Sequence, residues 1–237
     1  HSDLRRQRQM CIRDSSNAQN NISDSRIFSQ IQVLNEDFRR TNSDAINTPS
    51  QFQSVVADMS INFCLATKDP DGNPTNGIIR KFTNKSGFSL YDTTIHYNAT
   101  GGSDAWDSEK YLNIWVCNIY GGILGWAQFP YAGTKETDGV VINHDNFGIN
   151  LNYSSAYNLG RTTTHEVGHW LNLFHVWGDN TCGDDFVFDT PTQEQATYGC
   201  KIHPHISCQN SGDMFMNFMD YSDDDCMNSF TNGQKSR

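Results

Sequence analysis

The stretch HEVGHWLNLFH, residues 165–175, constrains this chain more than any other part of it. His165 and His169 stand four positions apart, so on an α-helix both side chains project from the same face. Two imidazole nitrogens on one face can hold one metal ion, and Glu166 lies beside the first of them. Histidines that serve only as surface or core residues would not need this register. The sequence therefore predicts a helix over 162–172 that carries a zinc site.

A third histidine completes this site only if the helix ends before it. His175 lies six positions after His169, and a continuing helix would turn it away from the ion. The chain must therefore turn between them at a residue that tolerates positive φ, where glycine is the least strained choice and asparagine the next. Asn172 stands at that point. Three histidine ligands leave room for a water molecule, whose pKa zinc lowers and whose proton Glu166 can take.

Charge and hydropathy exclude several partners. The formal net charge is −10 and the sequence pI is about 5.1, which argues against nucleic acid and anionic membrane surfaces. No apolar run approaches the roughly 18 residues that a membrane span needs. The hydrophobic content of 36% and the length of 237 residues suit one domain with one or two lobes. We expect a monomer whose partners are protein or peptide substrates and metal ions.

The first residues of the chain do not read as part of the domain. The string MCIRDS at 10–15 resembles one translated frame of a common sequencing-library adapter, so we expect residues 1–15 to be an artefact. The alternative makes Cys11 a latency cysteine that holds the metal from a pro-segment, but no glycine or aspartate flanks it in the usual way. Residues 16–25 are polar and lack a period, which predicts a disordered pro-segment tail.

The rest of the chain predicts an α+β fold. A helical period begins at Arg26 and ends in the polar loop 41–50, whereas regular pattern fades after His175. Apolar runs predict strands at 59–66, 111–118 and 139–143, of which 111–118 should be central in the sheet, and a glycine-flexed edge strand over 121–130. The expected architecture is an upper lobe with a twisted mixed β-sheet and a backing helix, followed by an irregular lower lobe.

The seven cysteines of the chain indicate whether it works in an oxidising or a reducing compartment. Without Cys11 six remain, and four of these lie in the loop-rich C-terminal part, which is typical of a disulfide framework in an oxidising environment. Four cysteines allow three pairings, and spacing alone does not choose between them. Free buried thiols are the alternative, and it is stronger for Cys64 and Cys117, which lie in apolar runs. A third bridge between these two is conceivable, but buried thiols on neighbouring strands are the simpler expectation.

Beyond these patterns, the sequence resembles a known class of enzymes. HEVGHWLNLFH followed by NFMDY at 217–221 is similar to the metzincin metalloproteases, which have a methionine turn beneath the zinc. Met219 matches that methionine, and Tyr221 matches a tyrosine that helps to hold the tetrahedral intermediate. The motifs YLNIWVCN, GWAQFP, DGVVI, HVWGD, DTPTQ and MFMNFMDYSDDDCM resemble the pappalysin family, in its bacterial ulilysin- and mirolysin-like branch. The resemblance covers residues 26–237.

This resemblance implies a secreted, zinc-dependent endopeptidase with a two-lobed metzincin-like catalytic domain and structural calcium. Four aspartates surround a turn in the loop 178–192, and oxygen ligands suit calcium; a solvated acidic loop is the alternative. Matched to the family's calcium loop, the candidate ligands are the side chains of Asp185 and Thr190 and the carbonyls of Asp184 and Phe188, with Asp189 as a weaker candidate. Matched to the family's crossed bridges, the disulfides are Cys182–Cys208 and Cys200–Cys226.

The resemblance also indicates how a substrate would lie. Asp224 matches the acidic base of the pocket for the residue just after the scissile bond, where a buried carboxylate would select Arg or Lys; a solvated acidic triplet is the alternative. The backbone of Gly125, Trp126 and Ala127 would pair with the substrate, or else form only a protected edge. A protease that cuts before arginine could trim its own pro-segment, which makes Arg26 the candidate mature N-terminus.

Two classes of function therefore compete. In the first, Glu166 takes a proton from the attacking water, Tyr221 and zinc stabilise the oxyanion, and Glu166 passes the proton to the leaving amine. In the second, the chain is an inactive metal-binding adhesion module built on a protease scaffold. Because both Glu166 and Tyr221 are present, the sequence favours the endopeptidase.

Overall fold

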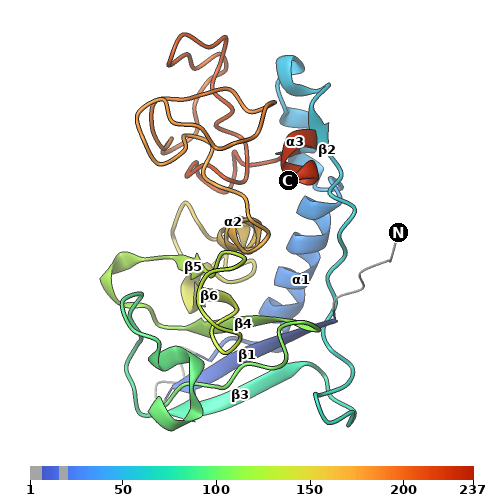
Figure 1. Cartoon of the computed structure of the whole chain (residues 1–237), viewed down its shortest axis with the longest axis vertical. Helices are drawn as coiled ribbons and strands as arrows, with labels where there is room; N and C mark the ends of the chain where they lie inside the picture. The colour runs from blue at the N-terminus through green and yellow to red at the C-terminus, as the bar shows by residue number, and fades with distance from the viewer. Residues whose placement is uncertain (1–6, 16–20) are drawn as a thin grey trace.

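The computed structural model describes the backbone of residues 7–15 and the whole of residues 21–237, which form a sheet lobe and an irregular lobe (Figure 1). Within these residues the sheet lobe holds five strands in the order β3-β1-β4-β6-β5. They are β1 (Gln7–Ser15), β3 (Ile78–Thr83), β4 (Tyr111–Cys117), β5 (Gly125–Ala127) and β6 (Gly139–Asn143). Neighbouring strands are parallel except β5, which pairs antiparallel with β6 at the edge. The sheet is mixed, as the sequence predicts.

Strand β4 is buried along its whole length because both faces of the sheet are covered. Leu112, Ile114 and Val116 face the main core, which also contains the apolar side chains of the helices. Trp115 and Cys117 face a second core on the opposite side of the sheet. Since successive side chains of a strand point to opposite faces, a strand with two covered faces must be apolar throughout. The prediction of a central strand at 111–118 is therefore confirmed.

Helix α1 (Asp24–Phe38) is the backing helix, and its apolar stripe includes Ile27 and Leu34, both fully buried. Ser23 caps it by accepting a hydrogen bond from the backbone N–H of Arg26 at 3.3 Å. The helix begins two residues before Arg26, so the predicted disordered segment 16–25 extends too far at its C-terminal end. Residues 16–20 of that segment lie outside the described residues.

Strand β1 falls within residues 1–15, which the sequence predicts to be an artefact. The structure pairs its backbone with β3 on one side and with β4 on the other. Both neighbours need a strand between them to complete their hydrogen bonds, so this position belongs to the fold whichever residues occupy it. The origin of residues 1–15 stays a prediction, and residues 1–6 are not among the described ones.

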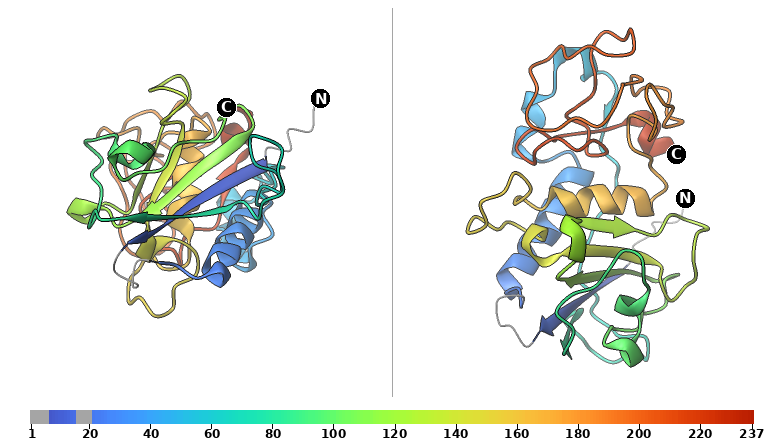
Figure 2. Two further views of the ribbon diagram at one scale, coloured as in Figure 1. Left: turned by 90° about the horizontal axis from the view of Figure 1, so that it is seen from below. Right: turned by 90° about the vertical axis from the view of Figure 1, so that its left-hand side faces the viewer.

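Helix α2 (Arg161–Trp170) lies between the sheet and the irregular lobe, as the right-hand view of Figure 2 shows. It packs against β5, β6 and α1, and all of its residues are buried. The predicted range 162–172 starts one residue late and ends two residues late, because the backbone leaves the helix at Leu171. A wholly buried helix of this kind can present its two histidines to the space between the lobes.

The segment 59–66 is not a strand, contrary to the prediction. Its side chains do alternate as in a strand, with Met59 and Phe63 buried in the main core. However, its anchoring hydrogen bonds come from α1. The N–H of Met59 donates to Phe38 O at 2.8 Å, and the Asn35 amide both donates to and accepts from the Phe63 backbone. A period of two therefore reflects an extended chain packed on a helix, which sequence alone does not separate from a sheet strand.

The irregular lobe follows α2 and carries little regular structure. Two disulfides join it, Cys182–Cys208 and Cys200–Cys226, with Cα–Cα distances of 5.7 and 5.6 Å, and these are the pairings that the resemblance implies. Further short elements are β2 (Val56–Ala57), which pairs with β7 (Phe230–Thr231), and α3 (Asn232–Ser236). The 3-10 turns are η2 (Ser43–Asn47), η3 (Ser50–Phe52), η4 (Thr94–His96), η5 (Asn98–Thr100), η6 (Tyr120–Gly122) and η7 (His144–Asn146).

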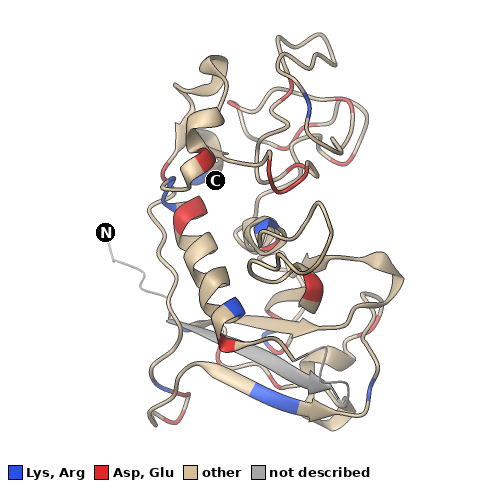
Figure 3. Cartoon of the chain, turned by 180° about the vertical axis from the view of Figure 1, so that it is seen from behind, with Lys and Arg blue, Asp and Glu red and all other residues tan. Residues whose placement is uncertain are grey.

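The remaining features of the fold are its free cysteines, the distribution of its charges and the absence of a membrane-spanning helix among the described residues. Cys117 is buried but Cys64 is exposed, and neither forms a disulfide, so the expectation of two buried thiols is wrong for Cys64. Charged residues are spread over both lobes rather than gathered into one basic face in the part of the chain that is described (Figure 3). Within that part, no helix is both long enough and apolar enough to span a membrane.

Candidate active site

The three histidines of the motif converge in the structure. His165 and His169 project from the same face of α2, and His175 approaches them from the turn that follows. One nitrogen from each ring can be chosen so that all three lie within 4.8 Å of one another, and the Nε2 atoms of His169 and His175 are 3.0 Å apart. Among the described residues this is the one cluster of histidine, cysteine or acidic side chains that could hold a metal ion.

The Nδ1 atom of each histidine lies beside a hydrogen-bond acceptor. The Nδ1 atoms of His165, His169 and His175 lie 2.7 Å from Phe218 O, 2.7 Å from Leu173 O and 2.5 Å from Asp179 Oδ1, respectively. An N–H at Nδ1 that donates to such an acceptor leaves the Nε2 lone pair free for a metal. The acceptors therefore fix both the ring orientation and the tautomer that zinc binding requires.

Burial keeps these imidazoles uncharged. It lowers the pKa of His165 well below its ordinary value and that of His169 to about 3, and the neighbouring histidines add to the effect. Burial also lowers the pKa of His175, although Asp179 opposes this by favouring the charged ring. Only a neutral imidazole binds a metal, so the site is ready for an ion without first losing protons. Three neutral nitrogen donors suit zinc, and the residues present fit that ion.

Asn172 makes the turn that brings the third histidine back. Its φ is +77°, in the left-handed region. The N–H of Asn172 donates to His169 O at 2.9 Å, and that of Leu173 donates to Gly168 O at 3.0 Å. These two bonds form a Schellman motif, which ends a helix by satisfying its last carbonyl groups. The asparagine thus adopts the conformation that the sequence requires of it.

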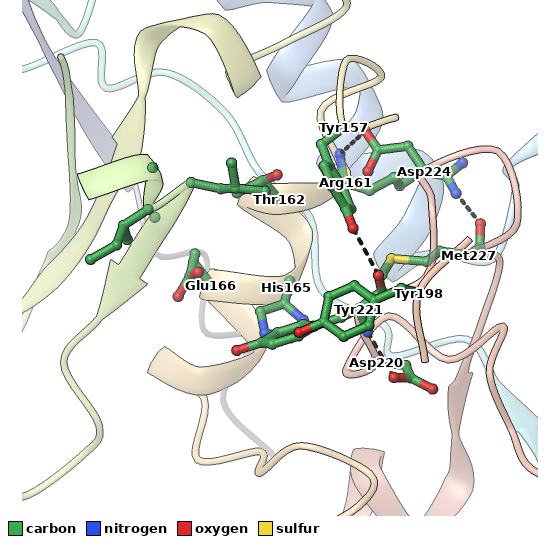
Figure 4. Close-up of a pocket in the computed structure, with 14 residues that line it drawn as sticks. Tyr157, Arg161, Thr162, His165, Glu166, Tyr198, Asp220, Tyr221, Asp224 and Met227 are labelled. Carbon is green, nitrogen blue, oxygen red and sulfur yellow. Dashed lines mark hydrogen bonds between the residues drawn. The ribbon is translucent and has the colours of Figure 1, made fainter. Parts of the chain in front are cut away.

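Glu166 is the next residue after His165 on α2, and Figure 4 shows both side chains. Its side chain is buried, and burial raises its pKa to about 8. A divalent cation beside the carboxylate would favour its charged form. Gly125 of β5 packs against it, since a Cβ at Gly125 would stand 3.0 Å from Glu166 Cγ. The carboxylate therefore sits between the three histidines and the edge strand.

The methionine turn lies under the metal site. Met219 is fully buried, and a Cβ at Gly168 of α2 would clash with its Sδ atom. The backbone of Met219 also accepts a hydrogen bond from Val176 N–H at 3.2 Å. This close packing ties the turn 217–221 to the helix and to the segment that carries His175.

Tyr221 lies against two of the three histidines. Its ring centroid lies 4.9 Å from that of His175 and 5.4 Å from that of His165. The hydroxyl of Tyr157 donates to the Tyr221 carbonyl at 3.1 Å, as Figure 4 shows. Burial raises the pKa of the Tyr221 hydroxyl above its usual range, so the group keeps its proton and can donate it in a hydrogen bond.

A pocket of about 390 Å³ opens beside Glu166 (Figure 4). Its walls come from the segment before β5, from α2 and its preceding loop, and from the irregular lobe: Gly122, Ile123, Leu124, Gly125, Tyr157, Arg161, Thr162, His165, Glu166, Tyr198, Asp220, Tyr221, Asp224 and Met227. Asp224 is 1% exposed, and its Oδ2 accepts hydrogen bonds from the N–H groups of Leu159 and Arg161. Its Oδ1 has no hydrogen-bond partner among the described residues. A buried acceptor is therefore left over in the pocket wall.

Strand β5 forms the rim of this site. Gly125, Trp126 and Ala127 pair with β6 along one side, and no described strand pairs with the other side. All three residues are partly exposed. The edge strand is shorter than the predicted 121–130, because 3-10 turn η6 precedes it and the chain leaves the sheet after Ala127.

In the acidic loop 178–192, some of the predicted calcium ligands lie together and others lie apart. Thr190 Oγ1 lies 2.9 and 2.8 Å from the two carboxylate oxygens of Asp185, and burial raises the pKa of Asp185 to about 6. Asp184 accepts from the N–H of Phe186. Asp189 instead binds the N-terminal end of α3, since it accepts from Gly233 N–H at 2.8 Å. The side chain of Phe188 is 88% exposed, so only its carbonyl remains as a ligand candidate.

Two residues of the candidate site were not indicated by the sequence patterns. Arg161 lines the pocket and forms ion pairs with Asp37 and Asp44, both at 3.1 Å. It stands four residues before His165 on α2, so helical spacing could have revealed that the two share a face. Tyr157 comes from an irregular loop, and no local pattern indicates its contact with Tyr221.

The fold and the site together define the class. A two-lobed α+β domain, with an HExxH helix, a left-handed turn to a third histidine and a methionine turn beneath them, is a metzincin-type metalloprotease domain. Sequence comparison identifies the family within this class. The chain belongs to the pregnancy-associated plasma protein-A family of peptidases, whose model matches residues 96–237.

Individual relatives agree with this assignment. Mature mirolysin of Tannerella forsythia, solved in complex with a cleaved peptide, has 47% sequence identity and a TM-score of 0.92, covering 97% of this chain and 88% of that one. An extracellular metalloprotease of Colletotrichum graminicola is 46% identical over 123 residues, which are 48% of this chain and 43% of the relative. One from Pyricularia oryzae is 34% identical over 224 residues, 91% of this chain and 66% of the relative. The chain spans about half the length of several curated relatives that it matches.

Proposed function

We propose that this chain is a zinc endopeptidase that acts outside the cell. The observation that carries the proposal is the convergence of three neutral histidines beside the buried carboxylate of Glu166. His165, His169 and His175 would hold the ion, which would polarise the substrate carbonyl and lower the pKa of water. The names of the relatives and the two disulfides agree with an extracellular location.

Glu166, Tyr221 and Tyr157 would carry out the other steps of the reaction. Glu166 takes the proton from the attacking water and later gives it to the leaving amine. The Tyr221 hydroxyl, which burial keeps protonated, donates a hydrogen bond to the developing oxyanion. Tyr157 holds the Tyr221 backbone in position. An inactive binding module would need none of these groups in this arrangement.

The pocket beside Glu166 would bind the substrate residue that follows the scissile bond. Asp224 Oδ1 is buried and lacks a hydrogen-bond partner among the described residues, so a cationic side chain could supply one. Arg, or else Lys, is therefore the proposed preference at this position. The backbone of Gly125, Trp126 and Ala127 would add the peptide to the sheet as an antiparallel strand.

Calcium would stabilise the acidic loop. The oxygen atoms of Asp185 and Thr190 already lie together, and the carbonyls of Asp184 and Phe188 are the further candidates, whereas Asp189 is engaged with α3. We expect calcium to raise the melting temperature of the wild type by several degrees and to have a much smaller effect on Asp185→Asn. Differential scanning fluorimetry with and without calcium, at fixed zinc, makes this comparison.

The mature N-terminus stays a proposal as well. The Ser25–Arg26 bond lies in the first turn of α1, and the Arg26 guanidinium donates to the carbonyls of His144 and Phe147. These side-chain contacts would survive a cut before Arg26. Mass spectrometry of the secreted protein would contradict the proposal if the chain began elsewhere.

The decisive experiment compares the full chain with its Glu166→Ala variant. Each is incubated with a proteome-derived peptide library, with and without a zinc chelator, and every new terminus is read by mass spectrometry. We expect cuts that the chelator and the substitution both abolish, with Arg enriched after the cleaved bond. Removal of a general base typically lowers rates by about 10²–10⁴-fold. Folded, zinc-loaded protein that makes no cuts would favour the binding module instead.

A further inference from the structure

An aromatic surface runs outward from the metal site on the side away from the Asp224 pocket. The ring of Phe129 lies 5.1 Å from that of His169, and Phe174 stacks on Phe129 at 5.2 Å. Phe186 follows at 5.7 Å from Phe174. The three phenylalanines come from three separate segments: the chain after β5, the residue before His175, and the acidic loop. We call Phe129, Phe174 and Phe186 the aromatic platform.

The platform is ordered and yet accessible. Phe186 is 66% exposed, and Phe129 and Phe174 are partly exposed. The Arg237 guanidinium packs over the rings of Phe174 and Phe186, at 4.8 and 5.6 Å from their centroids. It also donates to Asn172 O at 2.7 Å. Rigid aromatic rings that remain open to solvent beside a metal site are typical of a binding surface.

The direction of the edge strand β5 determines which part of a bound peptide would reach these rings. A substrate added antiparallel to β5 has its N-terminal residues beside the C-terminal end of β5. The Asp224 pocket adjoins Gly122–Gly125 at the other end, and Phe129 stands two residues after Ala127. Residues before the scissile bond would therefore lie along the platform. At about 3.3 Å per residue, ring spacings of 5.1–5.7 Å let the platform extend beside some three of them.

We propose that the aromatic platform binds an apolar side chain within the three substrate residues that precede the scissile bond. The substrate class is thus a peptide with an aromatic or aliphatic residue before the cut and a cationic residue after it. This inference rests on the proposed function, because it uses the same cleft and the same peptide direction.

Paired peptides test the proposal on the full, zinc-loaded chain. Each peptide has Arg after the scissile bond, and Phe or Ser stands at one of the three preceding positions. We expect kcat/KM to be roughly tenfold higher for Phe at one of these positions at least, which is what a partly buried apolar contact usually supplies. In Phe186→Ala the ratio of the Phe peptide to the Ser peptide should fall toward one. Phe174→Leu, which keeps apolar volume, should lower the ratio less.

The matched control is Phe82→Ala. Phe82 is 64% exposed, much like Phe186, but lies on β3 at the opposite edge of the sheet. It should leave the ratio as in the wild type. Equal rates for Phe and Ser at all three positions, or an unchanged ratio in Phe186→Ala, would overturn the platform and leave the protease standing.

Binding separates this failure from failure of the proposed function. Fluorescence anisotropy measures the affinity of the same labelled peptides for Glu166→Ala, where no turnover is needed. If the wild type cuts nothing but the Phe peptide still binds Glu166→Ala roughly tenfold tighter than the Ser peptide, the platform stands and the catalytic proposal fails. If the two peptides bind equally, the platform is wrong whether or not the chain cuts.

Discussion

At the scale of single residues, the site depends on partners that hold each ligand in one orientation. His165 uses a carbonyl of the methionine turn, His169 uses the carbonyl of Leu173, and His175 uses the carboxylate of Asp179. Two of these three acceptors are backbone atoms, so no residue type in the sequence marks them. The spacing of the motif reveals the ligands, whereas the groups that orient them become visible only in the folded chain.

Asn172 offers a test at this scale. Its positive φ favours Gly and Asn, so Asn172→Gly should be nearly neutral, whereas Asn172→Ala should destabilise the fold by about 1–2 kcal/mol. Because the same turn positions His175, Asn172→Ala should also weaken zinc binding. Urea unfolding gives the first quantity and competition with a chromogenic chelator gives the second. Equal stability and zinc affinity in the two variants would show that the left-handed turn does not control the site.

At the scale of elements, the junction between α1 and α2 positions the zinc helix. Asp37 of α1 is buried and forms an ion pair with Arg161 at 3.1 Å, and it accepts from the Thr164 hydroxyl at 2.7 Å. Gln30 of the same helix donates to Gly160 O and accepts from the Thr163 hydroxyl. These polar contacts to Gly160, Thr163 and Thr164 hold the N-terminal end of α2, which lacks a side-chain N-cap.

This junction predicts a pH dependence. Burial raises the pKa of Asp37 from 3.8 to about 7, although Arg161 opposes the shift. A carboxyl whose folded pKa is raised contributes stability that is fully present below pH 3.8 and is lost as the pH rises through about 7. The neutral variant Asp37→Asn lacks this loss. Between pH 5 and pH 8 the stability of the wild type should therefore fall relative to Asp37→Asn by more than about 1 kcal/mol.

Urea unfolding of both zinc-loaded proteins at the two pH values measures this difference. Comparison of the two curves cancels the contributions of the histidines, which have the opposite sign because their folded pKa values are lowered. If the two stabilities change in parallel, Asp37 is ionised in the fold throughout this range.

How well the sequence predicts an element depends on where its hydrogen bonds go. Strands 111–118 and 139–143 were predictable because an apolar run that is buried on both faces is a strong signal for a central strand. The segment 59–66 has an equally clear period of two, but its backbone is anchored by Phe38 and Asn35 of α1. The site followed the same rule: a helical register gave the ligands His165 and His169, whereas Tyr157 and Asp179 came from irregular chain that has no register.

At the scale of the whole molecule, the two lobes differ in what stabilises them. The sheet lobe and α2 share one apolar core, which also contains Phe218, Met219 and Met227 of the irregular lobe. The rest of the irregular lobe has few regular elements. Its chain is held by side-chain hydrogen bonds, by two disulfides and by a small apolar cluster of Phe52, Met214, Phe215 and Met216. Cys200–Cys226 lies next to the pocket residues Tyr198 and Met227, whereas Cys182–Cys208 closes the acidic loop.

The two bridges should therefore fail differently when each is replaced by a pair of serines. Each joins cysteines 26 residues apart, so loss of either should cost about 3.5 kcal/mol of stability on the chain-entropy account. Loss of Cys200–Cys226 should also raise KM for peptides with Arg after the scissile bond, since it frees the chain on both sides of the Asp224 pocket. Loss of Cys182–Cys208 should leave that KM nearly unchanged and instead reduce the stabilisation by calcium. Unfolding curves and kinetics on the two double variants separate these outcomes, and an identical KM in both would mean that the apolar core alone shapes the pocket.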